Sequence, residues 1–454
     1  MSTVVRQFIR GLGLDAYVVG GAVRDELLGL PHKDEDFLIL GVDHAGLRAA
    51  LEPHGRVEDM DVHGQLVGVR LYPRDAAVRE AAPSGIDLTP PRAERSTGPG
   101  HRDFEIVADA SITIEEDMGR RDFTVNALAR RLATDELVDA FGGSADLRAR
   151  VLRAVSDTSF SEDPLRILRG LRLVSQLGFD VESATLSQMQ READGLRHVS
   201  TERIGGGLAA DGLGELSRLL LGYEPARALQ LARDTGALVS FLPEFAAVVG
   251  YDLGSDRQPV PLDEHVFLVV QAATDAGASL AVRLAALLHD LGKPVADERG
   301  TSHADEGARL ASTALARLRY PTKLQRLVVQ IVGAHAFHTK GEWDGQRARR
   351  FLAEHGDELA FELVAHKSAD LATKNVTPEE SAGIAGLAEA LGRERSSPHR
   401  LRDLAIDGAD LIAAGLVEGP ELGRVLDVLL REVVDDPARN DRARLLARAR
   451  EVVA

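Results

Sequence analysis

The chain has 454 residues, a formal net charge of −17 and no cysteine. At roughly 100–200 residues per domain, this length predicts two to four domains. The lack of cysteine excludes disulfides, thiolate zinc sites and a cysteine nucleophile, and no apolar run reaches the roughly 18 residues of a membrane-spanning helix. We therefore expect a cytoplasmic enzyme that does not bind membranes. Its acidic balance disfavours indiscriminate nucleic-acid binding but allows a local basic groove.

The first 140 residues combine strand and helix patterns. Short apolar runs predict strands over 17–19, 36–40, 64–71 and 137–141. Glycines 20 and 21 separate the first run from a helix predicted over 22–28. The segment 89–101 is dense in Pro and Gly, which predicts a loop. From Leu165 onward the apolar residues recur every three or four positions, so an α/β head followed by a long helical body is expected.

Asp34 and Asp36 stand two apart at the start of the second predicted strand. A period of two puts both carboxylates on one face, where they can hold magnesium against a triphosphate, and turns Glu35 toward solvent. Gly21 directly precedes the helix predicted over 22–28, so backbone N–H groups and Arg24 could bind phosphates at the start of that helix. Charged residues at strand ends and plain strand-to-helix turns are common. The aspartate pair and the glycine turn can therefore each be explained without any ligand.

Two arginine-rich clusters follow. Arg121 is the stronger candidate of the pair Arg120-Arg121 for clamping a triphosphate, with Asp122 as a structural partner or N-cap. Asp163 precedes Pro164, which suits the first position of a helix, so Asp163 is a natural N-cap. Arginines recur on that helix at three-residue spacing and form a slowly drifting stripe that can meet phosphates: Arg166, Arg169 and Arg172. An Asp beside an Arg can also read a nucleobase edge, although a solvated helix face gives the same pattern.

Four segments together resemble the successive motifs of the class II tRNA nucleotidyltransferases, the family of the CCA-adding enzymes and bacterial poly(A) polymerases. They are VVGGAVRD at 18–25, KDED at 33–36, EDMGRRDFTVNA at 116–127 and EDPLR at 162–166. The segments 406–412 and 419–423 resemble the family's tRNA-contacting tail. The resemblance therefore spans nearly the whole chain and implies an α+β fold, with a small, mainly antiparallel sheet in the head and helices beyond it.

The resemblance implies template-independent addition of CCA to the 3′ acceptor end of tRNA from CTP and ATP, with Mg²⁺ held by Asp34 and Asp36. It implies nucleotide binding by Gly21, Arg24, Arg121, Asp163, Arg166, Arg169 and Arg172. Asp163 and Arg166 read the base of the incoming nucleotide, so the protein serves as template. Asp87 is our candidate for a third carboxylate, although Pro90-Pro91 beyond it depart from the family pattern.

The helical body carries a second set of chemically suited residues, drawn from separate segments: His265, His289, Asp290, His303, His335 and Asp370. Imidazole and carboxylate groups from several helices can close a divalent metal site in a bundle. A single histidine is more often a surface or core residue. We expect that role for three others: His338, His355 and His366.

The phrase AALLHDLGK at 285–293, with His265 and Asp370, resembles the HD phosphohydrolase signature. Some CCA-adding enzymes carry this domain with metal-dependent phosphatase and phosphodiesterase activity. His303 and His335 match the extra histidines of active members. The resemblance therefore implies an active site that holds Ni²⁺, Mn²⁺, Co²⁺, Fe²⁺ or Mg²⁺. The segment 92–101 resembles the branch of the family that carries this domain, and as a loop it would govern the switch between C and A addition.

The expected domains are a head over 1–141, a neck and body with the base-reading motif over 142–260, an HD domain over 261–375 and a helical, tRNA-contacting tail over 376–454. A monomer or homodimer is expected. Three alternatives stay open at this point: a poly(A) polymerase, an enzyme that adds only CC or only A, and an HD phosphohydrolase whose head merely binds RNA.

Overall fold

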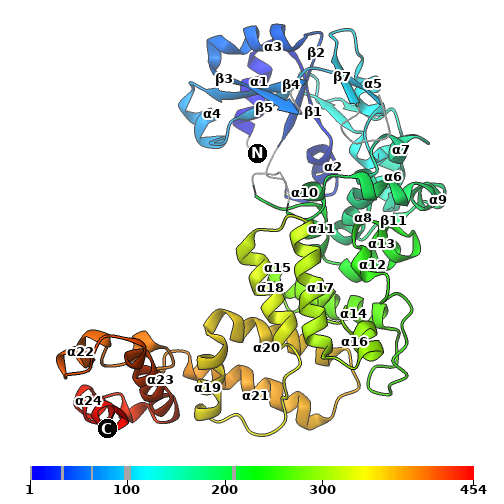
Figure 1. Ribbon diagram of the computed structural model, residues 1–454. Helices are drawn as coiled ribbons and strands as arrows, with labels where there is room; N and C mark the ends of the chain where they lie inside the picture. Colours follow the sequence, from blue (N-terminus) through cyan, green and yellow to red (C-terminus); the bar gives the residue numbers. More distant parts are fainter. Residues whose placement is uncertain (1–2, 32–34, 63–64, 97–103, 207–210, 454) are drawn as a thin grey trace. The chain divides into compact units, whose positions relative to one another are not determined.

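The structure is a computed structural model that describes residues 3–31, 35–62, 65–96, 104–206 and 211–453 (Figure 1). The chain divides into two compact units, Met1–Pro243 and Glu244–Ala454. Each unit is described by itself. In the described part of the chain, no helix is both long enough and apolar enough to cross a membrane.

The first unit is built on a seven-stranded sheet. Its strands are β1 (Asp15–Val19), β2 (Asp36–Leu40), β3 (Gly55–Val62), β4 (Gln65–Pro73), β5 (Ile86–Thr89), β8 (Ala129–Arg131) and β9 (Leu137–Val138). The spatial order is β3-β4-β5-β2-β1-β8-β9. All neighbours run antiparallel except β2 and β5, which are parallel. This confirms the mainly antiparallel sheet of the head, with the last predicted strand reduced to two residues.

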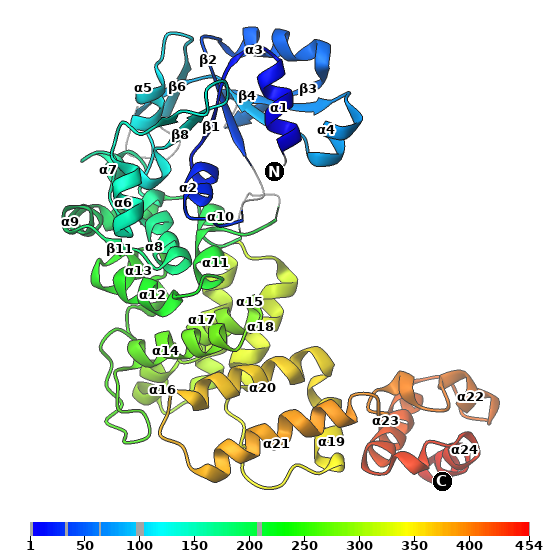
Figure 2. The same ribbon diagram turned by 180° about the vertical axis from the view of Figure 1, so that it is seen from behind.

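Helices of the head pack against this sheet: α1 (Thr3–Gly11), α2 (Gly21–Leu27), α3 (His44–Leu51), α4 (Ala76–Ala81) and α5 (Ile114–Gly119). Ile114 and Met118 of α5 are buried against Tyr17 and Leu38, which belong to one face of the sheet. Helices α3 and α4 contact β4, and α1 contacts α4 (Figure 2). The central strands β1 and β2 are buried along most of their length, so both faces of the sheet are covered there.

The predicted loop 89–101 is partly wrong. A hairpin of β6 (Arg92–Ser96) and β7 (Phe104–Ala108) occupies this part of the chain, with Arg92 opposite Ala108 and Ser96 opposite Phe104. Pro90 and Pro91 follow β5 directly, as expected for residues that interrupt a ladder. The strand after them is polar in sequence, so its hydrophobic pattern could not reveal it. Residues 97–103 lie outside the described part of the chain.

Glu35 was expected to face solvent, and this is also wrong. Its side chain is buried, and Arg6 of α1 donates from Nε to Glu35 Oε1 at 3.1 Å. Arg6 also pairs with Glu26 at 2.8 Å. The strand period alone could not show that a helix 29 residues earlier supplies a guanidinium to this carboxylate.

In its described residues, the rest of the first unit is helical apart from the two-residue parallel pair β10 (Val151–Leu152) and β11 (Asp180–Val181). Its helices are α6 (Gly143–Ala149), α7 (Ser159–Glu162), α8 (Leu165–Leu177), α9 (Ser183–Glu192), α10 (Thr201–Ile204), α11 (Glu215–Leu220), α12 (Pro225–Asp234) and α13 (Ala237–Phe241). Helix α8 is central, because it packs against both α11 and α12 through buried Leu168, Leu171 and Val174.

The second unit consists of helices in its described residues. They are α14 (Leu262–Asp275), α15 (Leu280–Leu288), α16 (Lys293–Arg299), α17 (His303–Arg317), α18 (Thr322–Ala334), α19 (Gly345–His355), α20 (Asp357–Ala372), α21 (Pro378–Glu394), α22 (Gly408–Ala413), α23 (Pro420–Asp435) and α24 (Arg442–Val453). Helices α14, α15, α18 and α20 form a packed bundle, and α22 to α24 share a separate small core around Leu411, Leu429 and Leu445.

Candidate active sites

The first candidate site lies where β1 meets α2. Gly20 has φ 75°, a conformation that favours glycine, and a Cβ there would lie 2.5 Å from Arg121 Nη1. Arg121 also lies within 3.4 Å of both the Asn126 carbonyl and Asp117 Oδ2. Burial lowers the pKa of Arg121, and Asp117 and Asp36 act in the opposite direction. The glycine turn therefore lets a largely buried cation approach the start of α2.

Arg24 and Arg169 are joined through two polar residues of the segment after α5. Arg24 Nη1 donates to Asn126 Oδ1 at 2.7 Å, and Asn126 Nδ2 donates to Asp122 Oδ1 at 2.9 Å. Asp122 Oδ2 accepts from Arg169 Nε at 2.7 Å. Burial alone would raise the pKa of Asp122, but Arg169 and Asn126 outweigh it and hold the pKa below its ordinary value. Asp122 is thus the structural partner that the sequence indicated.

Glu215 extends the same network and was not singled out in the sequence. It lies 3.1 Å from Arg172 Nε and 3.9 Å from Arg169 Nη1. Asp122 and Glu215 raise the pKa of Arg169, whereas burial lowers that of Arg172. Two of the three arginines of the predicted stripe therefore meet on one carboxylate. Only the position of Glu215 at the start of an amphipathic helix could have indicated it.

The Asp122–Arg169 pair should contribute measurably to stability. Asp122→Ala removes the main partner of Arg169, whose side chain is 37% exposed, and it also removes the acceptor of Asn126, so we expect the free energy of unfolding at pH 7 to fall by about 1–3 kcal/mol. The pKa of Asp122 is depressed in the folded state, so its contribution is present above the unfolded pKa of about 3.9 and is lost as the pH falls. Urea unfolding at pH 7 and pH 3 measures both effects.

Asp180→Ala is the matched control, because the Asp180 side chain is 80% exposed and pairs with Arg227 at the surface. We expect a loss below about 1 kcal/mol for this variant. Equal losses in the two variants would show that the Asp122–Arg169 pair contributes no more to the free energy of unfolding than a surface ion pair does.

Arg166 points away from the other two arginines of the stripe. Its guanidinium donates to the carbonyls of Ser159 at 3.1 Å and Arg120 at 2.8 Å. Asp163 Oδ1 accepts from Leu165 N–H at 3.0 Å, which is a capping contact, although the helix begins one residue later than predicted. Asp163 Oδ2 lies 3.2 Å from Arg203, a partner that the sequence did not reveal.

The carboxylates expected to hold metal in the head are partly described. Asp34 lies outside the described residues. Asp36 is exposed at the start of β2, and the register of Phe37 with Leu88 sets Asp36 beside Asp87 on the same face of the neighbouring strand. Asp87 accepts two hydrogen bonds from Arg70, at 2.6 and 2.8 Å, which raise the pKa of that arginine.

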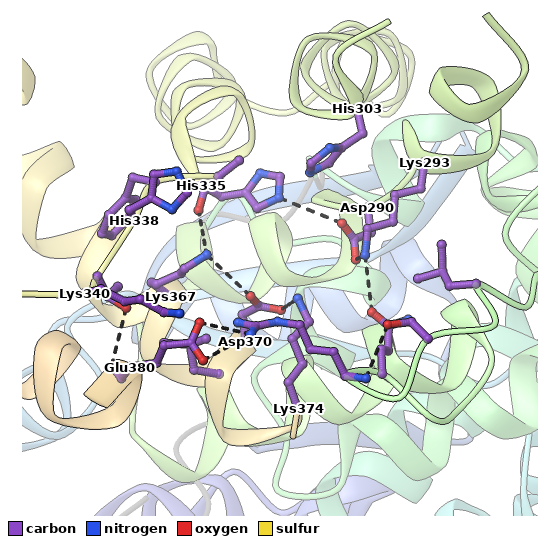
Figure 3. Close-up of a pocket in the computed structure, with 18 residues that line it drawn as sticks. Asp290, Lys293, His303, His335, His338, Lys340, Lys367, Asp370, Lys374 and Glu380 are labelled. Atoms are coloured by element: carbon purple, nitrogen blue, oxygen red, sulfur yellow. Dashed lines mark hydrogen bonds and ion pairs between the residues drawn. The ribbon is translucent and has the colours of Figure 1, made fainter. Parts of the chain in front are cut away.

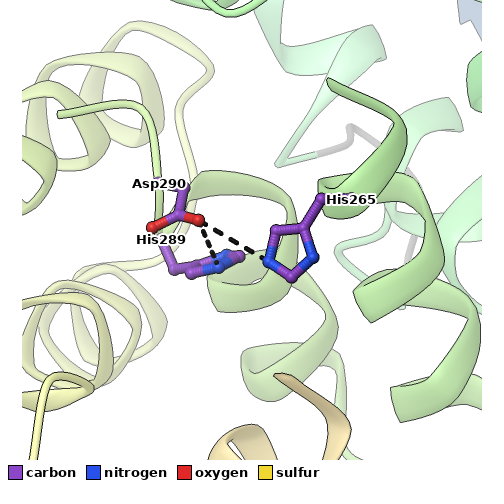
Figure 4. Close-up of side chains that lie close together, drawn as sticks. All are labelled: His265, His289 and Asp290. Carbon is purple, nitrogen blue, oxygen red and sulfur yellow. Dashed lines mark ion pairs between the residues drawn. The ribbon is translucent and has the colours of Figure 1, made fainter. Parts of the chain in front are cut away.

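The second candidate site lies inside the bundle of the second unit, where the structure gathers all six predicted residues. Asp290 Oδ2 lies 3.0 Å from His289 Nε2 and 3.6 Å from His265 Nε2 (Figure 4). Asp370 Oδ1 lies 3.2 Å from His265 Nε2 and 3.7 Å from His289 Nε2. One potential ligand group is His265, His289 and Asp290, and a second consists of Asp290, His303 and His335. Asp290 is common to both groups.

The donor set fits a divalent metal ion. Several buried side-chain atoms converge on this point: His265 Nε2, His289 Nε2, both Asp290 oxygens and Asp370 Oδ1. His289 Nδ1 lies 2.9 Å from the Ala286 carbonyl and His335 Nδ1 2.6 Å from the Val332 carbonyl. These contacts direct the Nε2 lone pairs into the site. Burial lowers the pKa of His335 to about 3, so its ring is neutral and able to ligate.

Lysines pair with the two aspartates of this cluster. Lys293 Nζ lies 2.7 Å from Asp290 Oδ2, and Lys374 Nζ lies 2.6 Å from Asp370 Oδ1. Burial opposes ionisation, but neighbouring His289 and Lys293 hold the pKa of Asp290 well below its ordinary range. His265 and Lys374 do the same for the pKa of Asp370. Both carboxylates are therefore anionic and suited to ligation. These lysines were not predicted, although Lys293 belongs to the phrase that indicated the site.

His366 was expected to be an ordinary core or surface residue. It is fully buried, with its ring centroid 5.0 Å from that of His289 and 5.7 Å from that of His335. Neither of its ring nitrogens has a hydrogen-bond partner in the described part of the chain, and it belongs to neither ligand group. Its spacing of four from Asp370 on α20 could have indicated this position.

Thr373 orients His265. Its hydroxyl donates to the Asp370 carbonyl at 3.0 Å, so its oxygen accepts from His265 Nδ1–H at 3.2 Å. Outer partners of this kind typically contribute 10–100-fold to metal affinity. We therefore expect Thr373→Val to weaken Mn²⁺ or Ni²⁺ binding by about that factor, and Thr373→Ser to retain it, in isothermal titration calorimetry. Equal affinity in the valine and serine variants would contradict this role.

The fold and the two clusters define an α+β nucleotidyltransferase head and neck with a helical HD-type bundle. Family models agree: "Poly A polymerase head domain" matches residues 16–153, "Probable RNA and SrmB- binding site of polymerase A" matches 178–248 and "HD domain" matches 262–413. The chain is 34% identical over 426 residues to the "Multifunctional CCA protein" of Xanthomonas campestris pv. campestris strain B100, covering 90% of this chain and 95% of the relative. The chain therefore belongs to the family of the multifunctional CCA proteins.

Solved structures agree with this assignment. The crystal structure of the Bacillus stearothermophilus CCA-adding enzyme in complex with CTP superposes with a TM-score of 0.71 and 25% identity, covering 99% of this chain and 96% of that one. The Thermotoga maritima CCA-adding enzyme complexed with tRNA has the same fold, with a TM-score of 0.60, 20% identity and coverage of 99% and 94%. The resemblance drawn from the sequence motifs is confirmed.

Proposed function

We propose that this protein is a tRNA nucleotidyltransferase that adds C, C and A to the 3′ acceptor end of tRNA from CTP and ATP. The observation that carries the proposal is the buried chain Arg24–Asn126–Asp122–Arg169, which unites predicted nucleotide-binding residues within one polar network. The relationship over 90% of the chain to a multifunctional CCA protein supports it. Fixed arginines and carboxylates are suited to select a nucleotide without a nucleic-acid template.

In this proposal the side chains of the head act mainly by positioning and by charge. Arg24 and Arg121, at the start of α2, bind the triphosphate with the N–H of Gly21. Asp163 and Arg166 read the base, and the network around Arg169 and Arg172 supports them. The 3′-hydroxyl of the tRNA attacks the α-phosphorus, and the bond to pyrophosphate breaks in line.

Asp34 and Asp36 are the proposed Mg²⁺ ligands, and Mg²⁺ would supply neutralisation of the phosphate charge. Asp87, in register with Asp36, is the proposed third carboxylate. Its two hydrogen bonds from Arg70 fix the orientation of the carboxylate, which would accept the proton of the attacking hydroxyl. The proposed compartment is the cytoplasm, and the proposed assembly is a monomer or homodimer.

A second activity is proposed for the HD bundle: metal-dependent hydrolysis of phosphoesters. The convergence of His265, His289, Asp290 and Asp370 on one buried point favours it. Ni²⁺, Mn²⁺, Co²⁺, Fe²⁺ or Mg²⁺ is the proposed ion and would supply Lewis-acid activation of the phosphoester. Asp290 belongs to both potential ligand groups and would be a ligand in either of them.

The test is nucleotide incorporation into tRNAs that end at the discriminator base, at C and at CC. Each tRNA is incubated with Mg²⁺ and CTP, ATP or both, and product length is read at single-nucleotide resolution. Stepwise addition that stops at CCA supports the proposal. A long A tail indicates a poly(A) polymerase, and addition of only C or only A indicates a partial enzyme. No incorporation, with phosphate still released from cyclic or terminally phosphorylated nucleotides, would leave an HD phosphohydrolase with an RNA-binding head.

A further inference from the structure

Basic side chains surround the carboxylates of the HD bundle in one cavity of about 620 Å³. They come from separate elements and are Arg257, Lys293, Lys340, Lys367 and Lys374. Figure 3 shows Lys293 and His303 on one side of this cavity, Lys340 and Glu380 on the other, and Asp370 between them. A cavity of this size accommodates a nucleotide.

These cations fall into an inner and an outer group. In the inner group, Lys293 pairs with Asp290 and Lys374 pairs with Asp370, while Lys367 donates to the His335 carbonyl at 3.2 Å. Each inner lysine is thus attached to the proposed metal-binding cluster.

The outer group lies away from the cluster. Arg257 Nη1 lies 3.0 Å from Glu380 Oε1, and the charges of Arg257 and Lys340 both lower the pKa of Glu380. Neither outer cation touches a proposed metal ligand among the described residues, because Arg257 pairs with Glu380 and Lys340 is exposed. The outer pair is therefore separate from the groups that would hold the reacting phosphate.

The side chains of the cavity carry a net positive charge. Five cationic side chains face the three carboxylates of Asp290, Asp370 and Glu380, which leaves two positive charges. One phosphate monoester carries about −1.5 to −2 at neutral pH and would balance them. Divalent cations bound at the His-Asp cluster would add the positive charge that a second phosphate needs. Phe337 also lines the cavity, and its ring centroid lies 5.6 Å from Lys367 Nζ. Its ring offers an apolar surface to the sugar or base that lies between two phosphates.

We propose that the HD cavity recognises a nucleoside that carries two phosphate groups, with the reacting phosphate at the His-Asp cluster and the second held by Arg257 and Lys340. A 3′,5′-bisphosphorylated nucleoside has this chemistry, either as a free nucleotide or as the last residue of a 3′-phosphorylated RNA. This inference rests on the proposed phosphohydrolase function. Arg257 and Lys340 are specificity-determining residues that do not take part in bond breaking.

The test compares adenosine 3′,5′-bisphosphate with adenosine 3′-monophosphate, adenosine 5′-monophosphate and a 3′-phosphorylated oligoribonucleotide. Phosphate release by the full-length, metal-loaded protein gives kcat/KM. We expect the bisphosphate to exceed both monophosphates by about 10- to 100-fold, the contribution of one or two hydrogen bonds to a charged group. The oligoribonucleotide arm distinguishes the two sources, since a preference for it over the free bisphosphate indicates an RNA end.

The double variant Arg257→Gln, Lys340→Ala should reduce this preference to near unity, with kcat/KM falling far more for the bisphosphate than for either monophosphate. Lys323→Ala is the control, because Lys323 is 84% exposed, pairs with Glu358 and does not line the cavity. A second readout is the Kd of the bisphosphate from calorimetry. It should rise about 10-fold or more in the double variant and stay unchanged in the control.

Equal kcat/KM for bisphosphate and monophosphates, or a preference that survives in the double variant, overturns the inference while the phosphohydrolase function stands. No phosphate release from any substrate contradicts the phosphohydrolase function. In that case, if the Kd of the bisphosphate still rises in the double variant, the cavity is a bisphosphate-binding site without hydrolytic activity. If the Kd is the same in the double variant, both proposals are wrong.

Discussion

Replacing Asp36 by asparagine should reduce incorporation of CMP and AMP into tRNA by on the order of 10³-fold. Asparagine keeps the shape of the side chain but removes the negative charge of a proposed Mg²⁺ ligand, and a metal-bound phosphoryl group gains several kcal/mol from such stabilisation. Because Asp36 is exposed at the start of β2, we expect the variant to fold normally, so that the loss of incorporation reports on catalysis. Single-turnover incorporation at saturating CTP measures the effect.

The control for this variant is the activity of the other unit. Phosphate release from a terminally phosphorylated nucleotide should equal that of the unaltered protein, because Asp36 belongs to the first unit and the His-Asp cluster to the second. Unchanged incorporation would remove Asp36 from the proposed catalytic site. A parallel loss of both activities would point to a general folding defect.

Replacing Asp290 by asparagine should have the converse result. Asp290 is the residue shared by both potential ligand groups, and it also holds Lys293 at 2.7 Å. The neutral amide therefore weakens both groups at once, and we expect phosphate release to fall by on the order of 10³-fold, with several kcal/mol of charge stabilisation lost. Incorporation of CMP and AMP should stay unchanged. Both activities are assayed on the same preparation.

His303→Ala provides the graded comparison for Asp290→Asn. His303 belongs to only one of the two ligand groups, so its removal should weaken Mn²⁺ or Ni²⁺ binding less than the Asp290 change does. Calorimetry with either ion measures the difference. If the two variants bind the ion equally well, Asp290 is not the shared ligand.

Most of the candidate sites could be predicted from the sequence, because their residues occur in short segments with chemically distinctive spacing. The carboxylate Asp36, the arginines Arg24 and Arg121 and the adjacent pair His289-Asp290 belong to this class. Their types and local order alone left a structural explanation open, and the resemblance of the four segments to the class II tRNA nucleotidyltransferases, with that of residues 285–293 to the HD signature, indicated the sites. The same resemblance implied the mainly antiparallel sheet, and the apolar periodicity predicted the helical body.

What escaped prediction depends on long-range pairing. Glu215 reaches Arg172 from another helix, Arg203 reaches Asp163 over 40 residues, and Arg6 buries Glu35 from the first helix. Glu215 has only a weak local signal, its position at the start of an amphipathic helix, and Arg203 and Arg6 have none, because a charged residue in a helix is usually solvated. The β6–β7 hairpin was not predicted for a related reason. Backbone hydrogen bonds between its two strands define it, and the sequence of the first strand has no apolar alternation.

The position of Asp122 has a consequence for how the head could be transplanted. Its sequence belongs to the head, but the arginine that balances its charge lies on α8, beyond residue 153 where the head family model ends. A fragment cut at that point would keep the buried Asp122 carboxylate but lose the Arg169 guanidinium that balances its charge. A fragment that extends to Pro243 keeps Arg169, Arg172 and Glu215 together. The head is therefore not a portable module, and a chimera would inherit the proposed nucleotide-binding network only together with the neck.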